Sequence, residues 1–297
     1  MESKKILLSA KIEDPLIHNI YQLLKARGKI ELYHHNPSIN SINLLSIRKF
    51  IQELDLIITK VGGDSSVDLL YIAQEYNIPM INNLKSILLC KNRIALDNSL
   101  RTLLKKYSKE LGIFNLPKSW SHPSPYKNIQ EFKRWVSERL PIVLKTHDQH
   151  NEYVRFNFLA KTTDEIDDFV LRYKDFLYFD LYFQEFIECD GFDRKIYVIG
   201  DKIFGIKREN PIYLYLREKP EKIDVSQIKR EEFVVEKDIK TLAKLISKEF
   251  DLKIYGFDLV KIPKSDKYYI IDLNDFPGFK GIENAAELIV EYISKFL

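Results

Sequence analysis

The sequence predicts an α/β protein divided into two or three lobes. Its length of 297 residues exceeds the usual size of a single hydrophobic core. In the first third of the chain, short apolar runs alternate with helical patterns, which is typical of a parallel sheet. From Tyr178 onward the residues become aromatic and β-branched, which favours successive strands.

A first lobe is predicted over residues 1–92, where strands and helices alternate. Glycine and polar residues separate the apolar runs, as expected for the turns between these elements. The predicted strands are 5–9, 30–33, 56–59 and 80–81, and the predicted helices are 16–27, 45–54 and 66–76.

A central lobe is predicted over residues 93–187 and a C-terminal lobe over residues 188–297. The central region begins with an amphipathic helix over 91–111 and continues with strands at 116–120, 142–146 and 153–159 and helices at 129–139 and 163–173. The remaining predicted strands are 179–187, 194–199, 202–207, 254–262 and 267–273, and the remaining helices are 236–250 and 284–296. Gly200-Asp201 predicts a hairpin turn.

Composition excludes several classes of protein. Hydrophobic residues make up 45% and charged residues 30%, which excludes a disordered chain. Lysine and arginine outnumber aspartate and glutamate by only 46 to 43, so no nucleic-acid partner is expected. Cys90 and Cys189 lack metal-site spacing, and no apolar stretch approaches the roughly 20 residues of a membrane span. We expect a cytoplasmic monomer that does not bind membranes.

Two predicted strands near the C-terminus carry carboxylate and amide side chains, in the runs YGFDLV (255–260) and YYIIDLN (268–274). Residues two apart on a strand share a face, so Asp272 and Asn274 point to one side, and a hairpin would bring Asp258 beside them. Neighbouring buried carboxylates are costly unless a cation neutralises them, and oxygen ligands suit Mg²⁺ with nucleotide phosphates. The alternative is that Asp258 caps a turn while Asp272 and Asn274 face solvent.

The segment IDLNDFPGF, residues 271–279, resembles the C-terminal motif of the ATP-grasp superfamily. It is most similar to that of the inositol-tetrakisphosphate 1-kinase / inositol 1,3,4-trisphosphate 5/6-kinase family. The resemblance implies an ATP-grasp fold, with an N-terminal parallel-sheet lobe and an ATP cleft between the central and C-terminal lobes. It also implies that Asp258, Asp272 and Asn274 bind Mg²⁺, with Gly278 on the substrate side.

Two further segments are similar to the same family. PIVLKTHDQHNEYVRF, residues 141–156, resembles a segment whose lysine binds ATP phosphates, which implies this role for Lys145 and a substrate-side role for His147 and His150. FQEFIECDGFDRKIYVIG, residues 183–200, resembles the hinge that holds adenine and the strand after it. This second match implies adenine contacts from Gln184, Glu185 and Ile187, and catalytic positions at the phosphate end for Lys195 and Arg208, with Lys195 also contacting substrate.

The remaining implied positions lie nearer the N-terminus. Arg93 matches an arginine near the nucleotide phosphates, and Lys60 matches a lysine that contacts substrate phosphate. Lys11 is a looser candidate of the same kind. Taken singly, each lysine or histidine of this set also fits a solvated surface position.

The leading prediction is therefore a Mg²⁺-dependent kinase that transfers the γ-phosphate of ATP to a hydroxyl of an inositol polyphosphate or a similar polyanionic polyol. A second prediction is an ATP-grasp carboxylate–amine ligase that works through an acyl phosphate, which Arg208 would stabilise. A third is a nucleotide-binding protein without turnover. The sequence lacks a clear Ser-His-Asp or Cys-His signature of nucleophilic catalysis.

Overall fold

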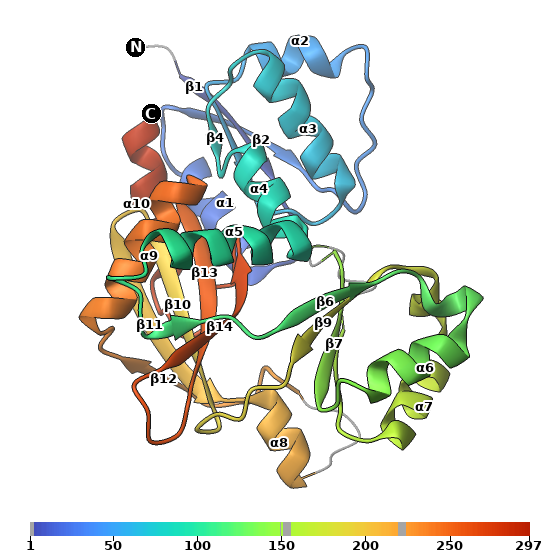
Figure 1. Ribbon diagram of the computed structural model, residues 1–297. Helices are drawn as coiled ribbons and strands as arrows, with labels where there is room; N and C mark the ends of the chain where they lie inside the picture. The colour runs from blue at the N-terminus through green and yellow to red at the C-terminus, as the bar shows by residue number, and fades with distance from the viewer. Residues whose placement is uncertain (1–2, 149, 151–155, 219–223) are drawn as a thin grey trace.

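The computed structural model describes residues 3–148, 150, 156–218 and 224–297. Three sheets organise these residues (Figure 1). An N-terminal four-stranded sheet is parallel, a six-stranded sheet lies in the C-terminal part, and a second four-stranded sheet forms a separate lobe. Within the described residues, no helix is long and apolar enough to cross a membrane.

The N-terminal domain confirms the predicted alternation of strands and helices. Its strand order is β2-β1-β3-β4, and all three strand pairs are parallel. Asp14 caps the first helix by accepting a hydrogen bond from the backbone N–H of Leu16. The strands are β1 Lys4–Ser9, β2 Ile30–His35, β3 Leu56–Thr59 and β4 Met80–Ile81, and the helices are α1 Pro15–Lys25, α2 Ile47–Gln52, α3 Asp64–Glu75 and α4 Leu84–Lys91.

The six-stranded sheet has the order β12-β11-β10-β13-β14-β5. One face packs on α5 Arg93–Lys106 and α9 Lys237–Phe250, and part of the other face packs on α1 and α10 Ala285–Ile293. The remaining part of that second face carries the polar residues described below. The strands are β5 Phe114–Asn115, β10 Phe192–Ile199, β11 Lys202–Glu209, β12 Arg230–Phe233, β13 Ile254–Lys261 and β14 Tyr268–Asn274.

The central lobe is an antiparallel sheet of order β6-β9-β7-β8 that packs on two helices, α6 Ile129–Ser137 and α7 Thr163–Arg172. A capping box between Thr162 and Glu165 begins α7. The strands are β6 Ser119–His122, β7 Ile142–Thr146, β8 Asn157–Ala160 and β9 Leu181–Glu185.

Several predicted elements differ in the structure. The helix expected over 91–111 is shorter in the structure, where α5 covers Arg93–Lys106 and begins at the side-chain cap of the extended Asn92. The helix α4, which ends at Lys91, had no predicted element. The strand expected over 116–120 is replaced by β5 and β6, which belong to different sheets. No element was predicted for the polar stretch around 217–232. In the structure, α8 Pro211–Glu218 ends at the start of this stretch and β12 begins at its end. The strand expected over 153–159 falls partly outside the described residues.

A buried asparagine joins the N-terminal domain to the six-stranded sheet. Asn82 is fully buried after β4, and its side-chain Nδ2 donates to the carbonyls of Ile254, at 2.6 Å, and Asp275. Its Oδ1 accepts hydrogen bonds from the backbone N–H groups of Lys253, at 2.7 Å, and Ile254, at 3.1 Å. One side chain therefore fixes the start of β13 and the loop after β14.

We expect Asn82→Ala to lower the free energy of unfolding by about 3 kcal/mol, because four backbone groups lose their partner in a buried position. Urea denaturation monitored by circular dichroism measures this change. The matched control is Asn98→Ala at an exposed position of α5, which we expect to change stability by less than about 0.5 kcal/mol. Equal effects from the two variants would contradict the role given to Asn82.

Candidate active site

The uncovered face of the six-stranded sheet carries charged residues on neighbouring strands. Strand register places Lys195 of β10 opposite Asp258 of β13, which in turn lies opposite Asp272 of β14. Two residues before Lys195 on the same strand, Asp193 lies opposite Arg208 of β11. Lys195 lies two residues before Tyr197 on β10, and Arg208 lies two residues after Ile206 on β11, so each lies on the same face as its neighbour. Tyr197 and Ile206 pack in the core below α1 and α10. We call these five residues the polar face.

Each cation of the polar face contacts a carboxylate. Lys195 forms an ion pair with Asp258, and Arg208 pairs with Asp193 at 3.1 Å. Arg93, which begins α5 and is buried, pairs with Asp272 at 3.1 Å between Nη1 and Oδ1. Arg93, Lys195 and Arg208 are thus each neutralised by an aspartate of the polar face.

Asp193 is a buried site residue that the sequence analysis missed. Its Oδ1 accepts a hydrogen bond from Asn210 Nδ2 at 2.6 Å, and its Oδ2 accepts from Arg208. Burial raises the pKa of Asp193, and the nearby Asp258 carboxylate raises it further, while Lys195 and Arg208 act in the opposite direction. Asp193 stands two residues before Lys195 on β10, and this spacing was a sequence signal for the cluster.

The three residues expected to hold Mg²⁺ lie together. Asp258 and Asp272 are opposite each other on paired strands, and Asn274 follows two residues later on the same face as Asp272. Two carboxylates and an amide oxygen are ligands that Mg²⁺ accepts, usually with phosphate oxygens and water completing its shell. No group of three or more His, Cys, Asp or Glu in the described ranges is arranged to hold a metal ion. The oxygen donors of Asp258, Asp272 and Asn274 fit Mg²⁺ bound together with nucleotide phosphates.

Lys145 projects from the central lobe toward the polar face. It is buried near the end of β7, and its Nζ contacts Gln184 Oε1 at 2.5 Å and the carbonyl of Ile271 on β14 at 3.2 Å. Gln184 is likewise buried, on β9. The two residues expected at the phosphates and at adenine are thus neighbours between the central lobe and β14.

The hinge residues occupy the end of β9 and the segment after it. Glu185 donates its backbone N–H to the carbonyl of Lys118 at 2.8 Å, and its side chain accepts from the N–H of Lys118 at 3.2 Å. The backbone N–H of Glu185 is therefore bonded to Lys118, the residue just before β6. Ile187 lies beyond β9 and is half-buried. The adenine contacts of both residues stay predictions.

The loop after β7 brings His150 to the segment that follows β14. His150 Nε2 lies 2.5 Å from Asp275 Oδ1, and Asp275 is buried. His150 Nδ1 and Asp275 Oδ2 are buried and have no hydrogen-bond partner in the described residues. His147 is half-buried, and its carbonyl accepts a hydrogen bond from the backbone N–H of Arg93. Sequence reasoning named both histidines but missed Asp275.

The other predicted substrate residues lie outside the strands that carry the polar face. Lys60 follows β3 in the N-terminal domain, and its ammonium contacts Asp14. The carbons of the Lys11 side chain lie against Gly62 in the same domain. Gly278 is exposed in the segment after β14. Their substrate contacts stay predictions.

Comparisons with known proteins match this architecture. The RimK domain protein ATP-grasp from Sphaerobacter thermophilus superposes with a TM-score of 0.66 at 14% identity over 98% of each chain. D-alanyl-alanine synthetase A from Vibrio cholerae superposes with a TM-score of 0.69 at 13% identity, covering 100% of this chain and 99% of that one. ATP-grasp ligase PsnB, solved with a variant of its minimal precursor, Mg and ADP, gives a TM-score of 0.62 at 14% identity over 100% and 99%.

Sequence comparisons add two similarities. Residues 214–295 match the model of the inositol 1,3,4-trisphosphate 5/6-kinase ATP-grasp domain. The coenzyme gamma-F420-2:alpha-L-glutamate ligase of Methanocaldococcus jannaschii is 26% identical over 186 residues, a match that covers 58% of this chain and 58% of that protein. The chain therefore spans little more than half the length of this curated relative.

The fold and these matches define the class of the protein. The chain has the fold of the ATP-grasp superfamily, and residues 214–295 match an ATP-grasp domain model. Within this superfamily, residues 214–295 carry the sequence pattern of the inositol kinase domain, while the curated relative and the superposed structures include ligases.

Proposed function

We propose that this protein is an ATP-dependent carboxylate–amine ligase that works through an acyl phosphate. The observation that carries the proposal is the charge balance of the site, where Arg93, Lys195 and Arg208 already face Asp272, Asp258 and Asp193. An inositol polyphosphate would need several lysine or arginine side chains that are not already neutralised, because each of its phosphates binds through charge-assisted hydrogen bonds. A carboxylate brings a single negative charge and requires no such surplus.

The similarities support the same proposal. The curated relative is named as a glutamate ligase, and the superposed structures include a D-alanyl-alanine synthetase and the ligase PsnB. These names describe those proteins, and the choice of acid and amine in this chain is a separate question.

The proposed reaction has two steps. A carboxylate oxygen attacks the γ-phosphorus of ATP, the bond from that phosphorus to the bridging oxygen breaks, and ADP leaves. The amine nitrogen then attacks the acyl carbon, the carbon–oxygen bond to phosphate breaks, inorganic phosphate leaves, and the amine loses one proton to solvent. The products are an amide, ADP and phosphate.

The residues of the site have distinct roles in this proposal. Lys145 and Arg93 hold the ATP phosphates, while Gln184, Glu185 and Ile187 hold adenine. Lys195 and Arg208 stabilise negative charge on the transferring group and the acyl phosphate. Asp258, Asp272 and Asn274 would hold Mg²⁺, which neutralises phosphate charge when bound.

A kinase is the second candidate, and the match of residues 214–295 to an inositol kinase domain favours it. That segment includes Asp258, Asp272 and Asn274. In a kinase the γ-phosphate would pass to a hydroxyl of a polyanionic polyol, and Lys60, His147, His150 and Gly278 would lie on the acceptor side.

Hydroxylamine separates the two candidates, because it converts an acyl phosphate to a stable hydroxamate without any amine substrate. We expect the purified protein with Mg²⁺ and ATP to form a hydroxamate and ADP in equal amounts with one member of a carboxylate panel. A parallel incubation with inositol phosphates should release no additional ADP. ADP release that depends on an inositol phosphate, with no hydroxamate from any carboxylate, would replace the ligase proposal with the kinase.

A further inference from the structure

A line of hydrogen bonds leads from α5 to Lys145. The carboxylate of Asp97, on α5, accepts a hydrogen bond from the Tyr182 hydroxyl at 3.2 Å. That hydroxyl oxygen accepts one from Gln184 Nε2 at 3.1 Å, and Gln184 Oε1 accepts one from the Lys145 ammonium at 2.5 Å. We call these four residues, Asp97, Tyr182, Gln184 and Lys145, the lysine network.

The strands of the central lobe bring three members of the lysine network to one face. Tyr182 and Gln184 are two residues apart on β9, and Lys145 lies opposite Tyr182 on β7. The side chains between them, Leu144 and Phe183, point to the other face and pack in the core of the lobe. The face that carries the network is therefore the one that meets α5.

The lysine network is largely shielded from solvent. Tyr182, Gln184 and Lys145 are 2%, 6% and 7% exposed. A space of about 20 Å³ adjoins Tyr182 and Gln184, lined mainly by residues of α5, β9 and β14. It has room for one water molecule and is too small for a nucleotide base. Tyr182 and Asp97 can therefore act on a bound nucleotide only through Gln184 and Lys145.

The negative charge of Asp97 fixes the direction of these hydrogen bonds. A carboxylate only accepts, so the single proton of the Tyr182 hydroxyl points to Asp97. Burial raises the pKa of Tyr182 well above its ordinary value, and the Asp97 carboxylate raises it further, so the hydroxyl keeps this proton. Its oxygen must then accept from the amide of Gln184, which turns the amide oxygen toward Lys145. The flipped amide would place N–H groups against an ammonium.

Asp97 is itself held in place by two neighbours. Arg101, one turn further along α5, donates from Nε to Oδ2 at 2.7 Å and from Nη2 to Oδ1 at 3.1 Å. Ser119 of β6 donates to Oδ1 at 2.9 Å. At the other end of the network, the Lys145 ammonium also contacts the carbonyl of Ile271, beside the polar face. The network thus runs from a fixed carboxylate to the position proposed for the ATP phosphates.

We propose that Tyr182 and Asp97 are positioning residues for Lys145. They orient the amide of Gln184, and its oxygen holds the Lys145 ammonium toward the polar face before ATP binds. A lysine that is held in advance loses less side-chain freedom on binding phosphate, so the affinity for ATP rises. The inference rests on the proposed role of Lys145 at the ATP phosphates, which the ligase and the kinase share.

Calorimetric titration of the full chain with ATP and Mg²⁺, without an acceptor, tests the proposal. Tyr182→Phe removes one hydroxyl and leaves the amide of Gln184 without its fixed partner. We expect this variant to raise the Kd for ATP roughly fivefold, the effect of one hydrogen bond. In a Lys145→Met background the same substitution should change the Kd less than about twofold, because no ammonium remains to be positioned.

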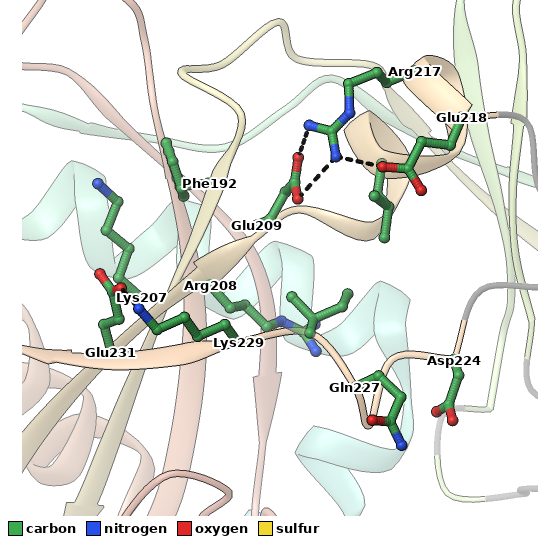
Figure 2. A pocket seen from close by; sticks show the side chains of 12 residues that line it. Phe192, Lys207, Arg208, Glu209, Arg217, Glu218, Asp224, Gln227, Lys229 and Glu231 are labelled. Atoms are coloured by element: carbon green, nitrogen blue, oxygen red, sulfur yellow. Dashed lines mark hydrogen bonds and ion pairs between the residues drawn. The ribbon is translucent and has the colours of Figure 1, made fainter.

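A second variant acts at the start of the lysine network. The amide in Asp97→Asn can donate as well as accept, so it no longer fixes the direction of the Tyr182 hydroxyl. We expect the Kd for ATP to rise roughly threefold, and this effect too should vanish in Lys145→Met. The control is Glu231→Gln on the edge strand β12, where Glu231 pairs with Lys229 at 2.7 Å (Figure 2). It should leave the Kd unchanged.

Loss of stability is separated from loss of positioning by a second buried tyrosine. Tyr255 is fully buried on β13, and its hydroxyl donates to the carbonyl of Ala243 on α9. Tyr255→Phe should lower the urea midpoint at least as much as Tyr182→Phe, because each variant loses a buried hydroxyl group. The Kd for ATP should not change in Tyr255→Phe.

Three results would overturn the proposal. They are an unchanged Kd in Tyr182→Phe, an equal effect of this substitution with and without Lys145, and a rise of the same size in Tyr255→Phe. Each of these removes only the positioning role, since ATP still binds. If the wild-type protein does not bind ATP, the nucleotide site falls and the proposed function with it. The hydroxylamine reaction tests the ligase chemistry separately.

Discussion

Asp272→Asn is expected to reduce ADP production by about 100-fold or more while the fold is kept. Asp272 lies opposite Asp258 on paired strands and also neutralises Arg93. The amide removes one negative charge from the proposed Mg²⁺ site, and charge stabilisation of this kind is worth about 100- to 1000-fold in rate. Asparagine is preferable to alanine here, because its amide oxygen can still accept the hydrogen bond from buried Arg93.

The measurement is the steady-state rate of ADP release at saturating ATP, with the carboxylate that gives a hydroxamate in the wild-type protein. Circular dichroism and the urea midpoint should match those of the wild-type protein. The control is Asp266→Asn, in the turn before β14, whose carboxylate is 98% exposed. Loss of activity in both variants, or near-normal activity in Asp272→Asn, would count against the metal assignment.

The sequence predicted the part of the site that depends on local periodicity. Alternation puts Asp272 and Asn274 on one face, and the hairpin register places Asp258 opposite Asp272. The register shift between Asp258 and Leu259, which turns Asp272 away from the face of Ile270, is not predicted by alternation. The βαβ alternation of the N-terminal domain was likewise readable, since each apolar run and each helical pattern is a property of a few consecutive residues. The metal itself stays a prediction.

Partners that come from distant strands could not be predicted in this way. Asp193 becomes a site residue only because the β10–β11 register places Arg208 opposite it and the strand end brings Asn210 within 2.6 Å. Asp275 meets His150 through a loop whose path the sequence pattern does not fix. β5 is two residues long and joins the C-terminal sheet, and no periodicity can be read over so short a segment.

Lys145→Met is expected to raise the KM for ATP at least tenfold and to lower kcat as well. Lys145 is buried and carries its ammonium to the carbonyl of Ile271, one residue before Asp272. Methionine keeps most of the volume and removes the charge, so phosphate binding is weakened with little change in packing. Initial rates over a range of ATP concentrations, with Mg²⁺ in constant excess, give both parameters.

The size of this effect also tests where the nucleotide binds. Gln184 shares its Oε1 with the Lys145 ammonium at 2.5 Å, so the two side chains belong to one buried contact between β7 and β9. Lys161→Met, at an exposed position in the same lobe, is the control and should leave the KM for ATP unchanged. If Lys145→Met alters stability but not the KM for ATP, the lysine serves the interface between the lobes, and the phosphates bind elsewhere on the polar face.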